Sequence, residues 1–250
     1  MISVERVSKE IALLTINRPP ANALSRDLIV AIKDSIREFG SEPEPPALIL
    51  SGEGDKFFSA GGDIREITEQ PDMAIPRMRE FHRMLCEVEH YAAPLICAVN
   101  GYAVGGALEI VLHADYVICS DNASFGFPEI NHGLLPAAKG ILQCAHRLGR
   151  RTAEKLLYSG DLISAQHAVK IGLVNKVVPI AGLAETALRE ARALRGKDLH
   201  LFSAIKGTLN NTVRMMDPEL EEYTIRDMVR YLERESTANA RQGFLNRKGS

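Results

Sequence analysis

The feature that most constrains this chain is a glycine-rich bend followed by an apolar segment, within Ala98–Asp115 (AVNGYAVGGALEIVLHAD). The pairs Asn100-Gly101 and Gly105-Gly106 predict a tight turn that lets another group approach the backbone closely. The next segment, Ala107–Ala114, is apolar on nearly every side, which is typical of a buried helix. The first turn of such a helix carries unpaired N–H groups and favours negative charge. The bend therefore predicts a backbone site for an anion.

Glu109 lies inside this apolar segment, one turn after Gly106 and on the same face of the predicted helix. A buried carboxylate is costly unless it is paired, protonated or used in chemistry. The residues alone leave two interpretations open. Glu109 caps the start of its own helix, or it belongs to a functional site beside the bend.

Segments of strand type and helix type alternate along the first half of the chain, which predicts an α/β architecture with a largely parallel sheet. After Pro136 helical patterns dominate. We expect an α/β core over residues 1–195 and a helical C-terminal region over residues 196–250. The expected strands are Ile11–Ile16, Ala47–Leu50, Leu95–Val99, Tyr116–Cys119 and a late one within Leu173–Val178; the expected helices are one opened by Ser25, one within Pro71–Tyr91, and Ala107–Ala114, Gly140–Leu148, Thr152–Tyr158, Ser164–Ile171, Gly182–Leu194, Leu199–Val213 and Glu219–Glu235.

Composition narrows the classes of function. A net charge of −2 gives no support for binding nucleic acid or an anionic membrane through bulk charge. No apolar run approaches the length of a membrane span, and the N-terminus lacks the pattern of a signal peptide. The four cysteines are widely spaced and the seven histidines show no ligand spacing, so we expect free thiols, no metal site and a cytoplasmic protein.

Two more segments could contribute to a site beside the bend: Phe57–Ile64 (FFSAGGDI) and Ser124–Ile130 (SFGFPEI). Together with AVNGYAVGGALE they resemble the enoyl-CoA hydratase/isomerase (crotonase) superfamily. The resemblance extends to Asn17-Arg18-Pro19, Asn22-Ala23-Leu24, Gly172–Asn175 and the tail Gly243–Lys248. It implies the crotonase (ClpP-like) spiral of repeated ββα units, with a helical C-terminal trimerisation region.

The resemblance also implies roles for four residues in catalysis. The N–H groups of Ala60 and Gly106 would form an oxyanion hole for a thioester carbonyl. Glu109 would activate water and Glu129 would protonate the α-carbon, because adding water to a conjugated C=C needs both a base and an acid. Without the resemblance, Glu129 after Pro128 reads as a solvated carboxylate at a helix start. Two glutamates twenty residues apart are the feature that favours hydration.

The same resemblance implies contacts with an acyl-CoA substrate. Asp63 is also expected to cap a helix beginning near Ile64, and for Arg247 and Lys248 a solvated chain end is an equal alternative. The implied substrate-binding residues are Ala21, Ala23, Leu24, Ser59, Gly61, Gly62, Asp63, Ile64, Gly105, Ala137, Arg247 and Lys248.

The sequence departs from the family after Glu129. Lys139 stands where a small residue is typical, and Asn131-His132 add polarity. We hypothesise that these changes mark a shorter or polar acyl substrate.

The expected protein is an enoyl-CoA hydratase without metal or redox cofactor, coenzyme A being part of the substrate. We expect a homotrimer or hexamer that binds neither nucleic acid nor membrane. Because fold does not fix reaction, an isomerase or another crotonase-type hydrolase or lyase stays open, as does a non-catalytic RNA- or acyl-CoA-binding member.

Overall fold

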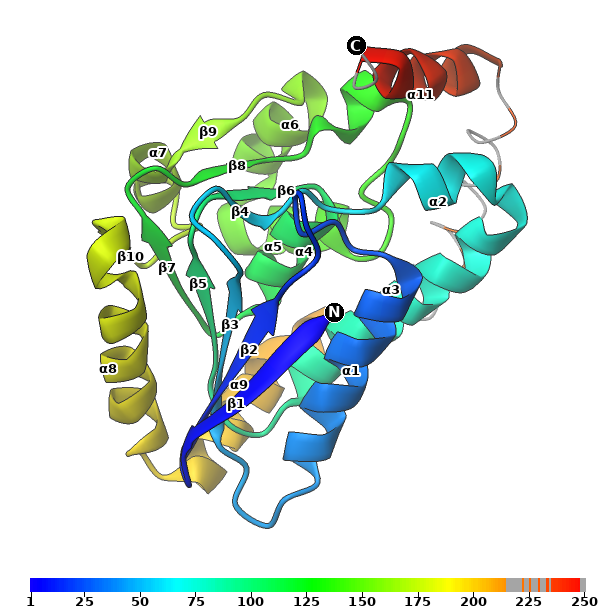
Figure 1. Ribbon diagram of the computed structural model, residues 1–250. Helices are drawn as coiled ribbons and strands as arrows, with labels where there is room; N and C mark the ends of the chain where they lie inside the picture. The colour runs from blue at the N-terminus through cyan, green and yellow to red at the C-terminus, as the bar shows by residue number, and fades with distance from the viewer. Residues whose placement is uncertain (215–221, 223–224, 226–228, 230–232, 234, 248–250) are drawn as a thin grey trace.

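Two β-sheets and the helices around them make up the fold in this computed structural model (Figure 1). The structure describes residues 1–214, 222, 225, 229, 233 and 235–247. The larger sheet has the order β1-β2-β3-β5-β7-β10, and all its pairs are parallel except β1 with β2. Its strands are β1 (Ile2–Ser8), β2 (Ile11–Ile16), β3 (Ala47–Gly52), β5 (Leu95–Val99), β7 (Tyr116–Ser120) and β10 (Lys176–Val178).

The smaller sheet has the order β4-β6-β8-β9. Its strands are β4 (Phe57–Ser59), β6 (Tyr102–Val104), β8 (Ser124–Gly126) and β9 (Ile163–Ser164). The first three run parallel, while β8 and β9 are antiparallel. The pairs β3-β4, β5-β6 and β7-β8 therefore each place one strand in the larger sheet and the next in the smaller one. This repeated step is the ββα spiral that the resemblance implies.

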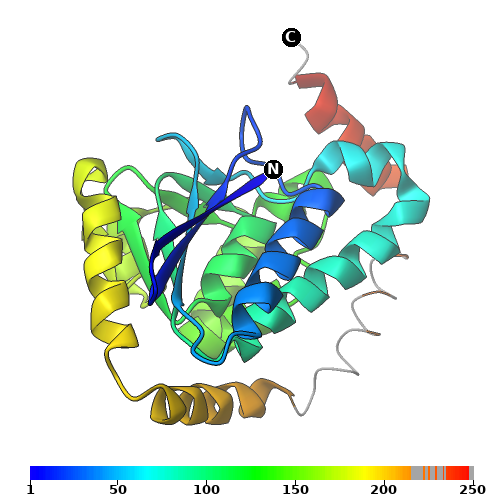
Figure 2. The same ribbon diagram turned by 60° about the horizontal axis from the view of Figure 1, so that its bottom comes forward.

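Helices cover both faces of the larger sheet. Figure 2 shows α8 along one side, and α1, α3 and α4 lie on the other. The helices are α1 (Arg26–Gly40), α2 (Ile64–Glu69), α3 (Ala74–His90), α4 (Gly106–His113), α5 (Gly140–Leu148), α6 (Arg150–Ser159), α7 (Ala165–Lys170), α8 (Leu183–Arg195), α9 (Leu199–Arg214) and α11 (Glu235–Arg247), with the 3₁₀ turns η1 (Pro71–Met73), η2 (Pro128–His132) and η3 (Ile180–Gly182).

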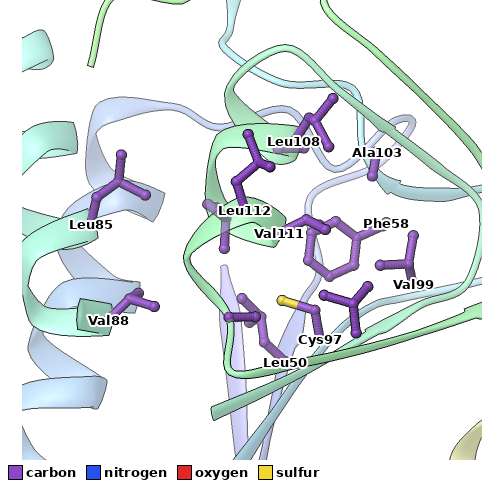
Figure 3. Close-up of a cluster of buried hydrophobic side chains, with 14 of the residues drawn as sticks. Leu50, Phe58, Leu85, Val88, Cys97, Val99, Ala103, Leu108, Val111 and Leu112 are labelled. Atoms are coloured by element: carbon purple, nitrogen blue, oxygen red, sulfur yellow. The ribbon is translucent and has the colours of Figure 1, made fainter. Parts of the chain in front are cut away.

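The main core lies between α4, α3 and the two sheets. Figure 3 shows Phe58 at its centre, packed among apolar side chains of α4 and of strand β5. Leu108, Val111 and Leu112 of α4 are buried there. Burying α4 on this scale stabilises the fold by about 1.5–3 kcal/mol for each large apolar side chain. The turn that begins α4 is thereby held rigidly at the ends of the smaller sheet's strands.

The α/β architecture expected from the sequence is confirmed, and most expected helices and long strands lie within a few residues of their predicted bounds. The short strands β4, β6, β8 and β9 were not predicted, because runs of two or three residues carry no readable periodicity. Strand β1 was also missed; most of its side chains are exposed, so its sequence shows no alternation. The expected helix at Glu219–Glu235 lies almost wholly outside the described residues. The division at residue 195 stays a prediction.

Across the described residues, no helix is both long and apolar enough to cross a membrane. All four cysteines are free thiols, and three of them are buried.

Candidate active site

The parallel order of the smaller sheet brings the three sequence motifs together. Because β4, β6 and β8 run parallel and adjacent, their carboxyl ends lie side by side at one edge. The turns that follow these strands carry Ala60–Gly62, Gly105-Gly106 and Glu129, respectively. Segments separated by up to about seventy residues in sequence thus meet because of the sheet's topology.

These turns line one cavity of about 690 Å³. Apolar side chains of α3, of the loop after η2 and of α11 contribute to its lining, among them Met78, Phe81, Leu135 and Leu245. The predicted site residues that line it are Ala21, Ala23, Ala60, Gly62, Asp63, Ile64, Gly105, Gly106, Glu109 and Glu129. Leu24, Ser59, Gly61 and Ala137 are not among the described residues that line it; Leu24, Ser59 and Ala137 are buried.

Glu109 lies on α4 and is 2% exposed. Its Oε2 accepts hydrogen bonds from the main-chain N–H groups of Lys139 (2.8 Å) and Gly140 (2.6 Å). Glu109 therefore caps the start of α5 rather than the start of its own helix, whose N-cap is Gly105. A Cβ at position 140 would lie 2.8 Å from Glu109 Cγ, so only glycine lets the carboxylate seat there. Burial raises the pKa of Glu109 to about 7, and the two N–H donors oppose that rise.

Glu129 lies on the 3₁₀ turn η2, against the glycine bend. A Cβ at position 105 would lie 2.6 Å from Glu129 Oε1, and Gly105 has a φ of +57°, so glycine is required there on both counts. Its Oε2 is buried and has no hydrogen-bond partner within the described part of the chain. Burial, and then the charge of Glu109, raises the pKa of Glu129 to about 8. The interpretation of Glu129 as a solvated carboxylate, which the residues alone favoured before the resemblance was considered, does not fit this buried Oε2.

The two main-chain donors expected for an oxyanion hole need one correction. The N–H of Ala60 donates to the carbonyl of Ala21 (2.9 Å), so it is not available to a ligand. The N–H groups of Gly62 and Gly106 have no acceptor among the described residues. These two glycines lie close together, because a Cβ on Gly106 would lie 3.6 Å from Gly62 N. Both line the cavity, so Gly62 replaces Ala60 as the candidate donor beside Gly106.

The N-terminal segment expected to contact the substrate supports this loop. Leu24 donates its N–H to Gly61 O (2.8 Å) and accepts from Asp63 N (3.1 Å). Asp63 caps α2, as expected, and also pairs with Arg18 (2.6 Å). Ser59 accepts from Gly61 N (3.1 Å). These bonds fix the turn that presents the Gly62 N–H.

Two side chains of α3 were not singled out from the sequence. Arg77 is buried and donates to Leu24 O (2.7 Å), directly beneath Gly62. Phe81 packs beneath Gly106, since a Cβ there would lie 3.1 Å from its ring. An arginine on the apolar stripe of an amphipathic helix was the available signal for Arg77. Phe81 looked like any other core residue.

The substrate hypothesis built on Lys139 is not supported. The Lys139 side chain is 3% exposed and points into the core, where its Nζ pairs with Glu89 (2.7 Å). Asn131 bonds Ser159 O (3.3 Å), and only His132 of this polar group lines the cavity. Arg247 ends α11, and Lys248 lies outside the described residues.

In the described ranges, no group of three or more His, Cys, Asp or Glu side chains could hold a metal ion.

Comparison with known proteins places this geometry in a family. The family model described as enoyl-CoA hydratase/isomerase matches residues 6–249. A crotonyl-CoA hydratase of Syntrophomonas wolfei is 37% identical over 196 residues, covering 76% of this chain and 73% of that protein. The solved structure of a carnitinyl-CoA dehydratase from Mycobacterium avium is 32% identical with a TM-score of 0.86, covering 97% and 96% of the two chains. Human mitochondrial Δ3-Δ2-enoyl-CoA isomerase, 21% identical, shares the fold with a TM-score of 0.93 over 99% and 98%.

Proposed function

Because the chain belongs to the enoyl-CoA hydratase/isomerase family, we propose that it is a hydratase that adds water across the 2,3-double bond of a 2-enoyl-CoA thioester. The product is the 3-hydroxyacyl-CoA. The observation that carries the proposal is a pair of carboxyl groups that line one cavity and differ in their hydrogen bonds. The buried Glu109 accepts from two main-chain N–H groups, whereas the Oε2 of the half-buried Glu129 has no partner among the described residues. The crotonyl-CoA hydratase among the relatives supports the same assignment.

The thioester carbonyl is the group that the glycine donors would bind. Its oxygen gains negative charge when hydroxide adds to the β-carbon and an enolate forms. The N–H groups of Gly62 and Gly106 would stabilise that charge, aided by the N-terminus of α4. Removing one donor of such a pair typically costs about 3–4 kcal/mol.

The two carboxyl groups would divide acid and base roles. Glu109, held by two N–H donors, is suited to be the carboxylate that takes a proton from water. Glu129, whose Oε2 has no donor among the described residues, is suited to hold the proton that goes to the α-carbon. Water thus supplies OH to the β-carbon, Glu129 supplies H to the α-carbon, and the proton taken by Glu109 returns the pair to its starting state.

The side chains that line the cavity are proposed to bind the acyl chain of the substrate. Met78, Phe81, Leu135 and Leu245 offer apolar surface to the acyl chain. The segment with Ala21 and Ala23, which also lines the cavity, is the proposed contact for coenzyme A. Coenzyme A enters as part of the substrate, and the addition is redox-neutral, so the proposal calls on no resident cofactor.

An assay of crotonyl-CoA hydration tests the proposal. The reaction is measured as the loss of the absorbance of the conjugated enoyl thioester. We expect turnover by the native protein and formation of 3-hydroxybutyryl-CoA. An enzyme that moves the double bond of a 3-enoyl-CoA but adds no water would be an isomerase, and the hydratase proposal would then be rejected.

The rate should depend on pH as a narrow bell. Activity requires Glu109 ionised and Glu129 protonated. It should fall on the acid side as Glu109 takes a proton, with a pKa near 7, and on the alkaline side as Glu129 loses one, with a pKa near 8. Profiles of kcat/KM for crotonyl-CoA measure both limbs. An optimum well below pH 6 would contradict this assignment.

We also propose that the protein assembles through α9 into a homotrimer or a hexamer. Leu201, Ile205 and Leu209 recur one helical turn apart on α9 and are 65%, 62% and 65% exposed. On the other side of α9, Lys206 is buried in an ion pair with Asp115 (2.8 Å). The helix is thus anchored to the core while an apolar stripe is left for another copy of the chain.

Replacing Ile205 and Leu209 together with glutamate should convert the assembly to monomers, because a trimer would bring these charges together in an apolar interface. Light scattering should show a mass of three or six chains for the native protein and of one for the variant. His200→Glu, at an exposed position of the same helix, serves as the control and should leave the mass unchanged. A monomeric native protein would refute the proposal.

A further inference from the structure

Three ionisable side chains form a buried cluster behind the cavity: Lys139, Glu89 and His113. They are 3%, 6% and 2% exposed, and none is among the described residues that line the cavity. Glu89 Oε2 lies 2.7 Å from Lys139 Nζ, and Glu89 Oε1 lies 3.2 Å from His113 Nε2. Burial would raise the pKa of Glu89, but His113 and Lys139 lower it to about 2. Glu89 is therefore a carboxylate inside the core.

The cluster joins three helices at the point where they meet. Glu89 comes from the end of α3, His113 from the last turn of α4, and Lys139 from the residue before α5. These helices pack against one another, α4 against both of the others. Taking an ion pair such as Lys139 and Glu89 out of water is costly, and replacing buried ion pairs by apolar residues is often neutral or stabilising. Stability alone is therefore a weak reason for this cluster.

Two members of the cluster also hold Glu109 directly. The main-chain N–H of Lys139 donates to Glu109 Oε2 (2.8 Å), and the next N–H, of Gly140, does the same (2.6 Å). His113, one turn along α4, donates from Nδ1 to the main-chain carbonyl of Glu109 (2.5 Å). Lys139 is thus bonded at both ends, with its ammonium on Glu89 and its main-chain N–H on the Glu109 carboxylate.

We propose that Lys139, Glu89 and His113 are positioning residues that hold the Glu109 carboxylate in the geometry needed for the reaction. An apolar side chain at position 139 would fill the core but would not fix the orientation of this loop between Pro136 and α5. An ion pair is directional, and the productive geometry of a catalytic group must be held to about 0.5 Å. The proposal rests on the hydratase function proposed above for Glu109.

The kinetic test uses Lys139→Met, Glu89→Gln and the double variant. The double variant removes both charges of the Lys139–Glu89 pair, so neither charge is left without the other, and it should fold even where a single variant does not. For crotonyl-CoA we expect kcat to fall by about 10- to 100-fold while KM stays within about two-fold, because the substrate touches none of these residues. The control is Lys206→Met, which removes another buried lysine from the ion pair with Asp115 without touching Glu109, and should leave kcat unchanged.

A second measurement does not depend on turnover. The carboxyl group of Glu109 can be titrated by NMR in protein labelled with ¹³C-glutamate. In the double variant its pKa should rise above the native value, because the carboxylate loses well-aligned N–H donors. A folded double variant with native kcat and a native Glu109 titration overturns the proposal. If the native protein does not hydrate crotonyl-CoA, the proposed function fails, and the titration alone still decides whether the cluster positions Glu109.

Discussion

Replacing Glu129 with glutamine is expected to lower kcat for crotonyl-CoA hydration by about 10³-fold or more. General acid–base groups typically contribute 10²- to 10⁴-fold, and glutamine cannot give a proton to the α-carbon. The change keeps the size of the side chain, so the fit against Gly105 is preserved. Binding of a saturated analogue, butyryl-CoA, should be retained, because the glycine donors remain.

Glu109→Gln should lower kcat by a similar factor, because this variant lacks the base where Glu129→Gln lacks the acid. Its amide oxygen can still accept from the N–H groups of Lys139 and Gly140, so the start of α5 stays capped, but it cannot take a proton from water. Steady-state rates of both variants, with butyryl-CoA binding as the control for the site, measure the effect. Residual activity above about a tenth for Glu129→Gln would show that the α-carbon proton comes from elsewhere.

The pH dependence of stability provides an independent check on Glu129. Its pKa is raised from 4.5 to about 8 in the folded protein, so the protonated carboxyl favours folding below pH 4.5 and this contribution is lost as the pH rises through 8. Thermal unfolding of Glu129→Gln at pH 8 should therefore show a Tm a few degrees above native, equivalent to about 1 kcal/mol or more. An unchanged Tm difference between pH 5 and pH 8 would argue that Glu129 is not buried as a neutral acid.

Local sequence signals predicted the fold class and most of the helices. Ser25 and Asp63 could be identified as helix caps because a side-chain oxygen before a helix has a local partner, and both accept the expected N–H bonds. The four short strands of the smaller sheet could not be found this way. Their stability comes from pairing with distant segments, and no pattern within two or three residues reports it.

The resemblance, rather than residue spacing, pointed to the two glutamates as a pair. The sequence did not show which of the two carboxyl groups holds the proton, and the structure adds the hydrogen bonds that bear on this question. In the proposed mechanism, the N–H donors around Glu109 and the lack of a partner for Glu129 Oε2 decide which carboxyl holds the proton. Lys139 was misjudged for the same kind of reason, because a charge in a sequence does not say whether it faces a cavity or a buried partner such as Glu89.

The main-chain donors were the hardest part to predict. The segment FFSAGGDI offers several adjacent N–H groups, and the sequence does not show which of them already donates a hydrogen bond within the protein. The bond from Ala60 N to Ala21 O joins residues 39 positions apart, so only the tertiary structure shows that Gly62 is the available donor. The same reasoning isolates Gly106 as the second donor, and it makes that N–H testable by substitution.

Gly106→Pro is expected to lower kcat by about 10²- to 10³-fold, because proline lacks the N–H that would stabilise the enolate oxygen. Gly106 is the first residue of α4, a position where helices tolerate proline, so the helix should persist. Gly106→Ala is the matched control. It adds the same Cβ, 3.1 Å from the Phe81 ring, yet keeps the N–H, so the crowding by Cβ affects both variants. Proline in addition replaces the amide hydrogen with its ring Cδ. Equal rates for the two variants would mean that the thioester oxygen is bound by other groups, whereas a further loss of 10²-fold in the proline variant would assign the donor to the Gly106 N–H itself.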